Sequence, residues 1–253
     1  MKAMIFAAGL GTRLKPLTDT MPKALVKVGG NPLLDIVARR LISSGVDSLV
    51  INAHHFASQI IRHVEDAGGY GVEVNIPVEE DMLLETGGGI LNARRYLEGC
   101  GCFLVHNVDI LTNLDLREFA GKMRPDALAT LAVSPRKTSR YLLFDDRMRL
   151  KGWTDIRTGE VRSPWPGLDP SSCTALAFSG IHCISDKIFK VMDEFGFSGR
   201  FPIMDLYLKA AAQYPIYGAV QTDMRLMDVG KTEVLGEADC FFEELKQNGT
   251  FGE

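Results

Sequence analysis

The sequence predicts an α/β protein with a mostly parallel sheet flanked by helices. In its first half, short β-like runs alternate with amphipathic segments, as in consecutive βαβ units. A glycine-rich turn, Gly9–Gly11, directly follows the first apolar run, which is typical of a strand leading to a ligand-binding loop. No repeat, low-complexity tract or linker divides the 253 residues, so we expect one large domain, or a domain with a small lid.

The first half contains four short apolar runs and three segments of helical periodicity. The runs are expected as strands at 3–7, 47–52, 71–76 and 102–105. Pro32 at a first helical turn and Gly45 after the last periodic residue bound the first helix. The expected helices cover 32–45, 56–66 and 87–96.

After Asp109 the pattern changes to longer strands and a long irregular stretch. Strands are expected at 127–133, at 141–151 with a turn at 145–147, at 175–184, and as a short pair near 216–220 and 225–227. Helices are expected at 186–194, 202–213 and 231–247. Residues 152–173 are rich in Gly, Pro, Ser and Trp, and a loop of this length in a compact domain tends to be functional or mobile.

Composition excludes several functional classes. A net charge of −4 argues against a nucleic-acid groove, and a polyanionic substrate must therefore be held by local cations and metal. No apolar run approaches the ~20 residues of a membrane span, so no membrane partner is expected. Five cysteines without C-x-x-C spacing favour reduced thiols and a cytoplasmic location. The sequence makes no prediction of oligomeric state.

The most informative segment is Gly9 to Lys23, which reads G-L-G-T-R-L-K-P-L-T-D-T-M-P-K. Its small residues let backbone N–H groups approach a polyanion, and Arg13 and Lys23 add charge. The alternative is a surface turn with two solvated cations. No G-x-x-x-x-G-K-[ST] occurs, which argues against a P-loop kinase or ATPase. Leu14 stands where G-x-G-x-x-G has its third glycine, which argues against a dinucleotide-binding Rossmann turn.

Three further segments place functional side chains near predicted element ends. Leu84 to Ile90 reads L-E-T-G-G-G-I, and three glycines at a helix start would expose backbone donors and admit a flat ring. Asp109 follows a strand, where ligands bind in open α/β sheets, although it could equally cap a turn. Asp228 is a second candidate carboxylate, or an N-cap for the helix expected from 231.

The pattern G-x-G-T-R-L-x-P-L-T-x-x-x-P-K closely resembles the signature of the sugar-phosphate nucleotidyltransferases, also called nucleoside-diphosphate-sugar pyrophosphorylases. Within this family, L-E-T-G-G-G-I is similar to the uridylyltransferases that act on N-acetylmuramic acid 1-phosphate. The resemblance implies a Rossmann-like mixed sheet of the nucleotidyltransferase GT-A-like type, with a small sugar-binding sub-region. It further implies a nucleotide-binding half at 1–112 and a sugar-phosphate-binding half at 113–253, without a C-terminal β-helix domain.

The resemblance also assigns residue roles. Arg13 and Lys23 would be catalytic, with Arg13 on the β- and γ-phosphates and Lys23 on the α-phosphate and the sugar phosphate. Asp109 and Asp228 would bind Mg²⁺, which prefers oxygen ligands and keeps several waters. The segment Phe178 to His182 resembles the one that faces the sugar phosphate, where Gly180 would let the ligand approach. Glu160 is expected at the sugar-phosphate site for a different reason, its place in the long stretch 152–173. The nucleotide-binding residues would be Ala8, Gly9, Gly11, Thr12, Arg13, Asn52, Glu85, Thr86, Gly87, Gly88 and Asn107.

The implied reaction is attack of a sugar 1-phosphate oxygen on the α-phosphorus of a nucleoside triphosphate, with release of pyrophosphate. A phosphate monoester with a second pKa near ~6 is already ionised at neutral pH, so no general base is needed. UTP is the expected nucleotide and N-acetylmuramic acid 1-phosphate the expected sugar. A guanylyltransferase for mannose or heptose 1-phosphate is the alternative enzyme. A catalytically silent sugar-nucleotide sensor is disfavoured because Arg13, Lys23, Asp109 and Asp228 are all present. The sequence departs from the family at Val108, where glycine is usual.

Overall fold

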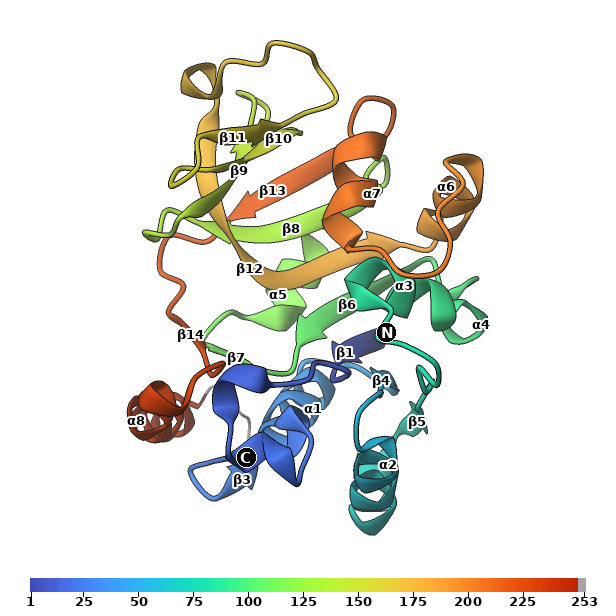
Figure 1. The fold of residues 1–253 in the computed structure, drawn as a ribbon, viewed down its shortest axis with the longest axis vertical. Helices are drawn as coiled ribbons and strands as arrows, with labels where there is room; N and C mark the ends of the chain where they lie inside the picture. Colours follow the sequence, from blue (N-terminus) through green and yellow to red (C-terminus); the bar gives the residue numbers. More distant parts are fainter. Residues whose placement is uncertain (250–253) are drawn as a thin grey trace.

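The computed structural model describes residues 1–249 and is built around one mixed ten-stranded sheet (Figure 1). The strands follow the order β11-β10-β9-β12-β6-β1-β4-β5, and β8 and β13 continue from β12 along a second branch. Helices cover both faces of the sheet. The predicted mixed α/β fold is therefore confirmed.

Four parallel strands form the part of the sheet that positions the site. They are β1 (Lys2–Phe6), β4 (Ser48–Asn52), β5 (Glu73–Asn75) and β6 (Cys102–Asn107). Phe6 at the end of β1 pairs with Asn52 on one side and with Asn107 on the other. The carboxyl ends of β1, β4 and β6 are therefore aligned at one edge, where an open α/β sheet binds its ligands.

The other half of the sheet is mainly antiparallel. It contains β8 (Ala129–Ser134), β9 (Arg140–Phe144), β10 (Leu150–Asp155), β11 (Glu160–Arg162), β12 (Thr174–Ser185) and β13 (Ile216–Val220). The strand β12 runs antiparallel to β6, β8 and β9, so it joins the two halves of the sheet. Two small sheets lie apart: β2 (Lys27–Val28) with β3 (Asn31–Pro32), and β7 (Ile110–Thr112) with β14 (Leu226–Asp228).

Side-chain alternation in the buried strands creates two cores. Ala3 and Ile5 of β1 belong to one core, whereas Met4 belongs to the other, because successive side chains of a strand point to opposite faces. The first core is covered by α1 (Leu33–Ser43), α2 (Ala57–Asp66), α5 (Leu116–Gly121) and α8 (Leu235–Gln247). The second is covered by α3 (Glu85–Asn92), α4 (Arg94–Leu97), α6 (Ile188–Glu194) and α7 (Ile203–Ala210).

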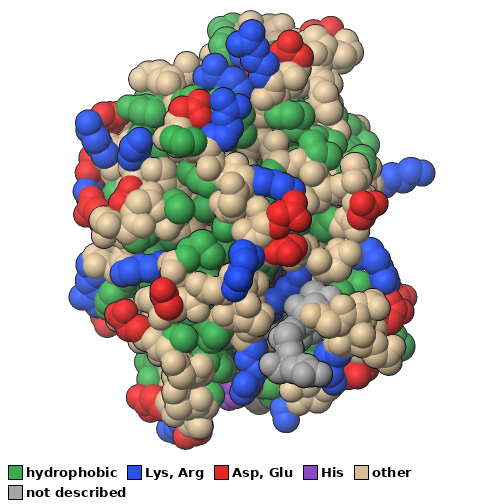
Figure 2. Space-filling view, turned by 180° about the vertical axis from the view of Figure 1, so that it is seen from behind, with side chains coloured by type: hydrophobic (Ala, Val, Ile, Leu, Met, Phe, Trp, Pro, Cys, Tyr) green, Lys and Arg blue, Asp and Glu red, His purple; other side chains and the backbone are tan. Residues whose placement is uncertain are grey.

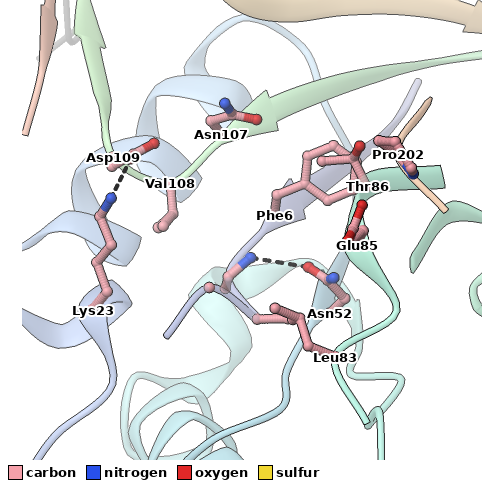
Figure 3. A pocket seen from close by; sticks show the side chains of 13 residues that line it. Phe6, Lys23, Asn52, Leu83, Glu85, Thr86, Asn107, Val108, Asp109 and Pro202 are labelled. Carbon is pink, nitrogen blue, oxygen red and sulfur yellow. Dashed lines mark hydrogen bonds and ion pairs between the residues drawn. The ribbon is translucent and has the colours of Figure 1, made fainter. Parts of the chain in front are cut away.

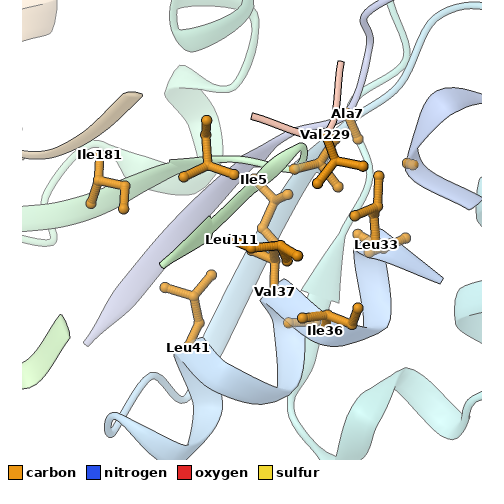
Figure 4. Close-up of a cluster of buried hydrophobic side chains, with 14 of the residues drawn as sticks. Ile5, Ala7, Leu33, Ile36, Val37, Leu41, Leu111, Ile181 and Val229 are labelled. Carbon is orange, nitrogen blue, oxygen red and sulfur yellow. The ribbon is translucent and has the colours of Figure 1, made fainter. Parts of the chain in front are cut away.

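The first core reaches the functional edge of the sheet (Figure 4). Ile5 of β1 and Val37 of α1 belong to it together with Leu111 of β7 and Val229 after β14. Fully burying one such side chain contributes about 1.5–3 kcal/mol. The apolar cluster therefore fixes the short β7–β14 pair, and with it Asp228, against the main sheet.

Short 3₁₀ turns connect several elements. They are Thr12–Leu14, Leu17–Asp19, Lys23–Leu25, Gly68–Gly71, Pro170–Ser172 and Thr232–Val234.

The structure corrects four sequence-based expectations. Residues 152–173 are not one loop, because they include the end of β10 and all of β11. The segments near 216–220 and 225–227 do not pair with each other: β13 pairs with β8, and β14 with β7. The helix expected at 87–96 is two helices, α3 and α4, on either side of Ala93. The last helix begins at Leu235 rather than near 231, after a 3₁₀ turn.

Within residues 1–249, no helix combines the length and apolarity that a bilayer crossing requires. On the face shown in Figure 2, acidic and basic side chains of the described residues are interspersed. A nucleic-acid-binding surface would instead gather the basic side chains into one patch.

Candidate functional site

A cavity of about 360 Å³ opens at the aligned carboxyl ends of β1, β4 and β6 (Figure 3). Eight residues expected from the sequence line it: Ala8, Gly9, Lys23, Asn52, Glu85, Thr86, Asn107 and Asp109. The cavity is also lined by Phe6, Ala7, Leu83 and Pro202, which no motif in the sequence indicated. Val108, where the resembled family has glycine, forms part of the wall and is 3 % exposed.

Lys23 and Asp109 meet in an ion pair at one side of this cavity, as Figure 3 shows. Lys23 begins the 3₁₀ turn Lys23–Leu25, and Asp109 lies between β6 and β7. Their side chains are only 10 % and 17 % exposed. Because water screens this pair weakly, the interaction between the charges is stronger than on an open surface.

Asp228 lies beside Asp109 because their segments are hydrogen-bonded to each other. Asp228 of β14 is opposite Ile110 of β7, and the N–H of Val229 donates to the carbonyl of Asp109 at 2.8 Å. Asp228 keeps contact with solvent, but desolvation by the surrounding protein raises its pKa, and the negative charge of Asp109 raises it further. Lys23, Arg13 and Arg136 oppose this shift. The site therefore combines two carboxylates with three cations.

Gly230 allows Arg13 and Asp228 to approach each other. A Cβ on Gly230 would lie 2.6 Å from both Arg13 Nη2 and Asp228 Oδ1. Arg13 itself is exposed, and no carboxylate within residues 1–249 lies within 4.0 Å of its guanidinium. Its charge is therefore available to a ligand.

The turn around Gly11 is held in place before any ligand binds. Gly11 has φ +62°, and a Cβ there would lie 2.9 Å from Thr18 Cγ2 and 3.0 Å from Lys23 Cβ. Its carbonyl accepts hydrogen bonds from Leu14 N and Thr18 Oγ1, both at 2.8 Å. The cavity lining includes Gly9 of this turn but not Gly11, Thr12 or Arg13.

The glycines of α3 have a role different from the expected one. We expected Gly87 and Gly88 to expose backbone donors, but both N–H groups donate to the carbonyl of Phe201, at 2.9 Å and 3.1 Å. A Cβ on Gly88 would overlap the carbonyl oxygen of Gly199, and one on Gly87 would overlap the Phe201 ring. These glycines therefore let the 199–201 segment pack closely on α3, which brings Pro202 to the cavity.

Glu79 is a buried residue that the sequence analysis missed. It is 2 % exposed, and its Oε1 accepts from Asn52 Nδ2 at 2.7 Å while Oε2 accepts from Leu84 N at 2.8 Å. Asn52 Oδ1 in turn accepts from the N–H of Ala7 at 2.9 Å. Asn52 thus ties β4 to the turn after β1, and Glu79 ties both to the segment that leads into α3. The sequence feature that could have pointed to Glu79 is an acidic residue just after the short strand expected near 71–76.

We expect Glu79→Gln to destabilise the protein by about 1–3 kcal/mol, because an amide cannot accept both hydrogen bonds and leaves one buried donor unpaired. KM for the nucleotide should rise, because the segment from Glu79 to Leu84 borders the cavity. The exposed neighbour Glu80 provides the control Glu80→Gln. Urea unfolding and steady-state kinetics of both variants test this expectation, and an unchanged midpoint for Glu79→Gln would contradict it.

Of the two residues expected at the sugar phosphate, the structure brings Gly180 to the site but not Glu160. Gly180 has φ +77°, and a Cβ there would lie 2.6 Å from Asn107 Nδ2, so the strand packs directly on this amide. Glu160 is exposed on β11, the edge strand, and β12, β9 and β10 separate that strand from β6. The long-loop assignment that suggested Glu160 was wrong, because the residue belongs to a hairpin.

The buried histidines near the site are neutral at neutral pH. Burial lowers the pKa of His106 to about 4 and that of His182 to about 3. His106 Nδ1 lies 2.8 Å from the carbonyl of Asn107, and His182 Nδ1 lies 2.7 Å from the hydroxyl of Tyr207. Both rings therefore have structural hydrogen bonds, which agrees with a reaction that needs no histidine base.

Comparisons with known proteins support this picture. The model of the nucleotidyl transferase family matches residues 2–141. An N-acetylmuramate alpha-1-phosphate uridylyltransferase from Caulobacter vibrioides is 35% identical over 222 residues, which cover 85% of this chain and 86% of that protein. A protein of the same name from Neisseria meningitidis serogroup B is 45% identical over 115 residues, which cover 46% of this chain and 49% of that protein.

Among solved structures, HddC from Yersinia pseudotuberculosis in complex with GMP-PN superposes with a TM-score of 0.72. The match covers 95% of this chain and 99% of that one, at 23% identity, and shows a shared fold. The family model spans more than half of the chain, and the relative from Caulobacter vibrioides is similar over most of its length. The resemblance read from Gly9 to Lys23 is thereby confirmed, and the chain belongs to the nucleotidyl transferase family.

Proposed function

We propose that this protein joins a sugar 1-phosphate to a nucleoside triphosphate and releases pyrophosphate. The single observation that supports this most is the convergence of Lys23, Asp109, Asp228 and Arg13 at the mouth of a preformed cavity. Four charged side chains from distant parts of the chain meet where β1 and β6 end. Such a group suits a reaction between two phosphate-bearing molecules, which must be held close together despite their repulsion.

In this proposal each cation has its own phosphate group. Arg13, which has no carboxylate within 4.0 Å among the described residues, contacts the β- and γ-phosphates and stabilises the pyrophosphate as it leaves. When the substrates bind, Lys23 leaves its ion pair with Asp109 and contacts oxygens of the α-phosphate and the sugar phosphate. The sugar phosphate is already ionised, so its oxygen attacks the α-phosphorus without a protein base. The nucleotide base and ribose lie in the cavity between Thr86, Asn107 and Pro202.

The two carboxylates fit a divalent cation that keeps part of its coordination for phosphate and water. Asp109 and Asp228 offer only oxygen atoms, the ligands that Mg²⁺ prefers. No third His, Cys, Asp or Glu joins them among residues 1–249, which leaves coordination positions for substrate oxygens. When bound, Mg²⁺ would neutralise charge on the transferring phosphates.

The proposed substrates are UTP and N-acetylmuramic acid 1-phosphate. Two relatives named as uridylyltransferases for N-acetylmuramate alpha-1-phosphate support this choice, one of them along most of both chains. The five cysteines are free thiols, which is typical of the cytoplasm, where such a reaction would take place.

The test is a matrix of nucleotides and sugars. Purified protein with Mg²⁺ is given UTP, GTP, CTP or dTTP together with N-acetylmuramic acid, N-acetylglucosamine, glucose or mannose 1-phosphate, and pyrophosphate release is measured. We expect the highest kcat/KM for UTP with N-acetylmuramic acid 1-phosphate. A preference for GTP with mannose 1-phosphate would instead favour a guanylyltransferase, and nucleotide binding without turnover would favour a sensor.

A further inference from the structure

Arg136 is a cation at the functional edge of the sheet that the reaction outlined above does not use. Because β12 runs antiparallel to both β6 and β8, these two strands point the same way, and β8 ends at the edge where β6 ends. Within β12, Phe178 is opposite Val133 of β8 and Ile181 is opposite His106 of β6. The loop that follows β8 is therefore close to the segment that holds Asn107 and Asp109.

The guanidinium of Arg136 is held in place yet keeps most of its donors free. Its Nη2 donates to the carbonyl of Phe178 at 2.9 Å, and the side chain is exposed. Within residues 1–249 no carboxylate lies within 4.0 Å of it. Two nearby arginines differ: Arg140 and Arg157 both form ion pairs with Asp155.

The segment of β12 that holds Arg136 also contacts the site. The pairing of β12 with β8 is irregular between Phe178 and His182, and Gly180 lies in this interruption with φ +77°. Gly180 packs directly on the side-chain amide of Asn107, and Phe178, two residues earlier in β12, accepts the hydrogen bond from Arg136.

We propose that Arg136 determines sugar specificity by binding a carboxylate of the sugar substrate. This inference rests on the proposed function. N-acetylmuramic acid differs from N-acetylglucosamine by one lactyl ether group, which carries a carboxylate. A guanidinium presents its N–H donors in a planar fork that matches a carboxylate, and one Nη2 contact to Phe178 fixes the orientation of that fork.

A role in binding phosphate is the competing explanation, and the position of Arg136 argues against it. Lys23 and Arg13 already come from the nucleotide half to the region where the phosphates would meet. Arg136 comes from the other side of β12, beyond Gly180, where the sugar-binding half begins. A phosphate contact would serve every sugar 1-phosphate alike, whereas a carboxylate contact would serve only the acidic sugar.

The experiment compares Arg136→Ala and Arg136→Lys with the wild type on two sugar 1-phosphates that differ only by the lactyl group. We measure kcat/KM with UTP for the N-acetylmuramic acid and the N-acetylglucosamine substrates, and calorimetric Kd values for the two UDP-sugar products. For Arg136→Ala, the ratio of the two kcat/KM values should fall about 10- to 100-fold, mainly through KM. Arg136→Lys should retain part of the preference, because it keeps the charge and loses the fork. The product affinities should change in the same ratio.

The control is Arg147→Ala, which removes the same charge from an exposed turn at the opposite edge. The backbone of Arg149, which ends this turn, forms an isolated β-bridge with Tyr217, and Tyr217 is opposite Thr130 near the start of β8. The turn therefore lies at the end of β8 away from Arg136. Equal losses for both sugars in Arg136→Ala, or an unchanged ratio, would overturn the assignment while leaving the proposed function intact. If the wild type converts neither sugar 1-phosphate and binds neither UDP-sugar, the proposed function and this inference both fail.

Discussion

Asp109→Asn is expected to lower kcat/KM at least about a hundredfold while leaving the protein folded. The substitution removes the negative charge that pairs with Lys23 and that lies beside Asp228. Lys23 then loses its orienting partner, and the proposed metal site loses one of its two carboxylates. The loss of a metal ligand acts on the phosphates in the transition state, so kcat should fall together with kcat/KM.

Three measurements distinguish the loss of these specific interactions from a general loss of folded structure. Asp66→Asn removes an exposed carboxylate at the end of α2 and should leave kinetics unchanged. Urea unfolding should show that Asp109→Asn remains cooperatively folded. Mn²⁺ binding, followed by electron paramagnetic resonance, should weaken in Asp109→Asn and remain normal in Asp66→Asn. Full turnover by Asp109→Asn would sink the proposed site.

Gly88→Ala is expected to destabilise the protein by about 3 kcal/mol, near the upper end of the usual cost of overpacking. The new Cβ would overlap the carbonyl oxygen of Gly199, which is backbone and cannot rotate away as a side chain would. The hydrogen bond from Gly88 N to Phe201 O would lengthen as α3 moved from the 199–201 segment. Because Pro202 follows this segment and lines the cavity, KM for the nucleotide should rise as well.

The matched control is Gly236→Ala in α8, where a Cβ would meet no atom within 4 Å and φ is not positive. That change should be neutral or stabilise the helix by up to about 1 kcal/mol, since alanine is the better helix former. Thermal and urea unfolding of both variants compares the same chemical change in a crowded and in an open helix. Equal stability of the two variants would contradict the role assigned to Gly88.

The sequence predicted most of the fold because its buried strands and helices have clear periods. Met4 and Ile5 lie in an uninterrupted apolar run, as a strand covered on both faces requires. The strand β7 escaped notice because a three-residue strand has too few positions to show a period. The pairing of β13 and β14 with β8 and β7 was also missed, since local patterns carry no information about distant partners.

The sequence predicted which residues belong to the candidate site better than it predicted how they are arranged. Lys23 and Asp109 were both expected, but their ion pair joins residues 86 positions apart and depends on the completed sheet. The lack of a side chain at Gly87 and Gly88 was correctly taken as a sign of close approach. The group that approaches them in the structure is the 199–201 segment, whereas a ligand was expected. Glu79 gave only a weak signal, because an acidic residue near a turn is ordinarily solvated.

The long strand β12 has a consequence for how substrates can be enclosed. It is hydrogen-bonded to β6, which ends at the cavity, and also to β8 and β9 of the antiparallel half of the sheet. Two rigid bodies that swing about a hinge would have to break this ladder of hydrogen bonds. Closure around the substrates would therefore come from a loop at the sheet edge, such as the segment between Glu79 and Leu84.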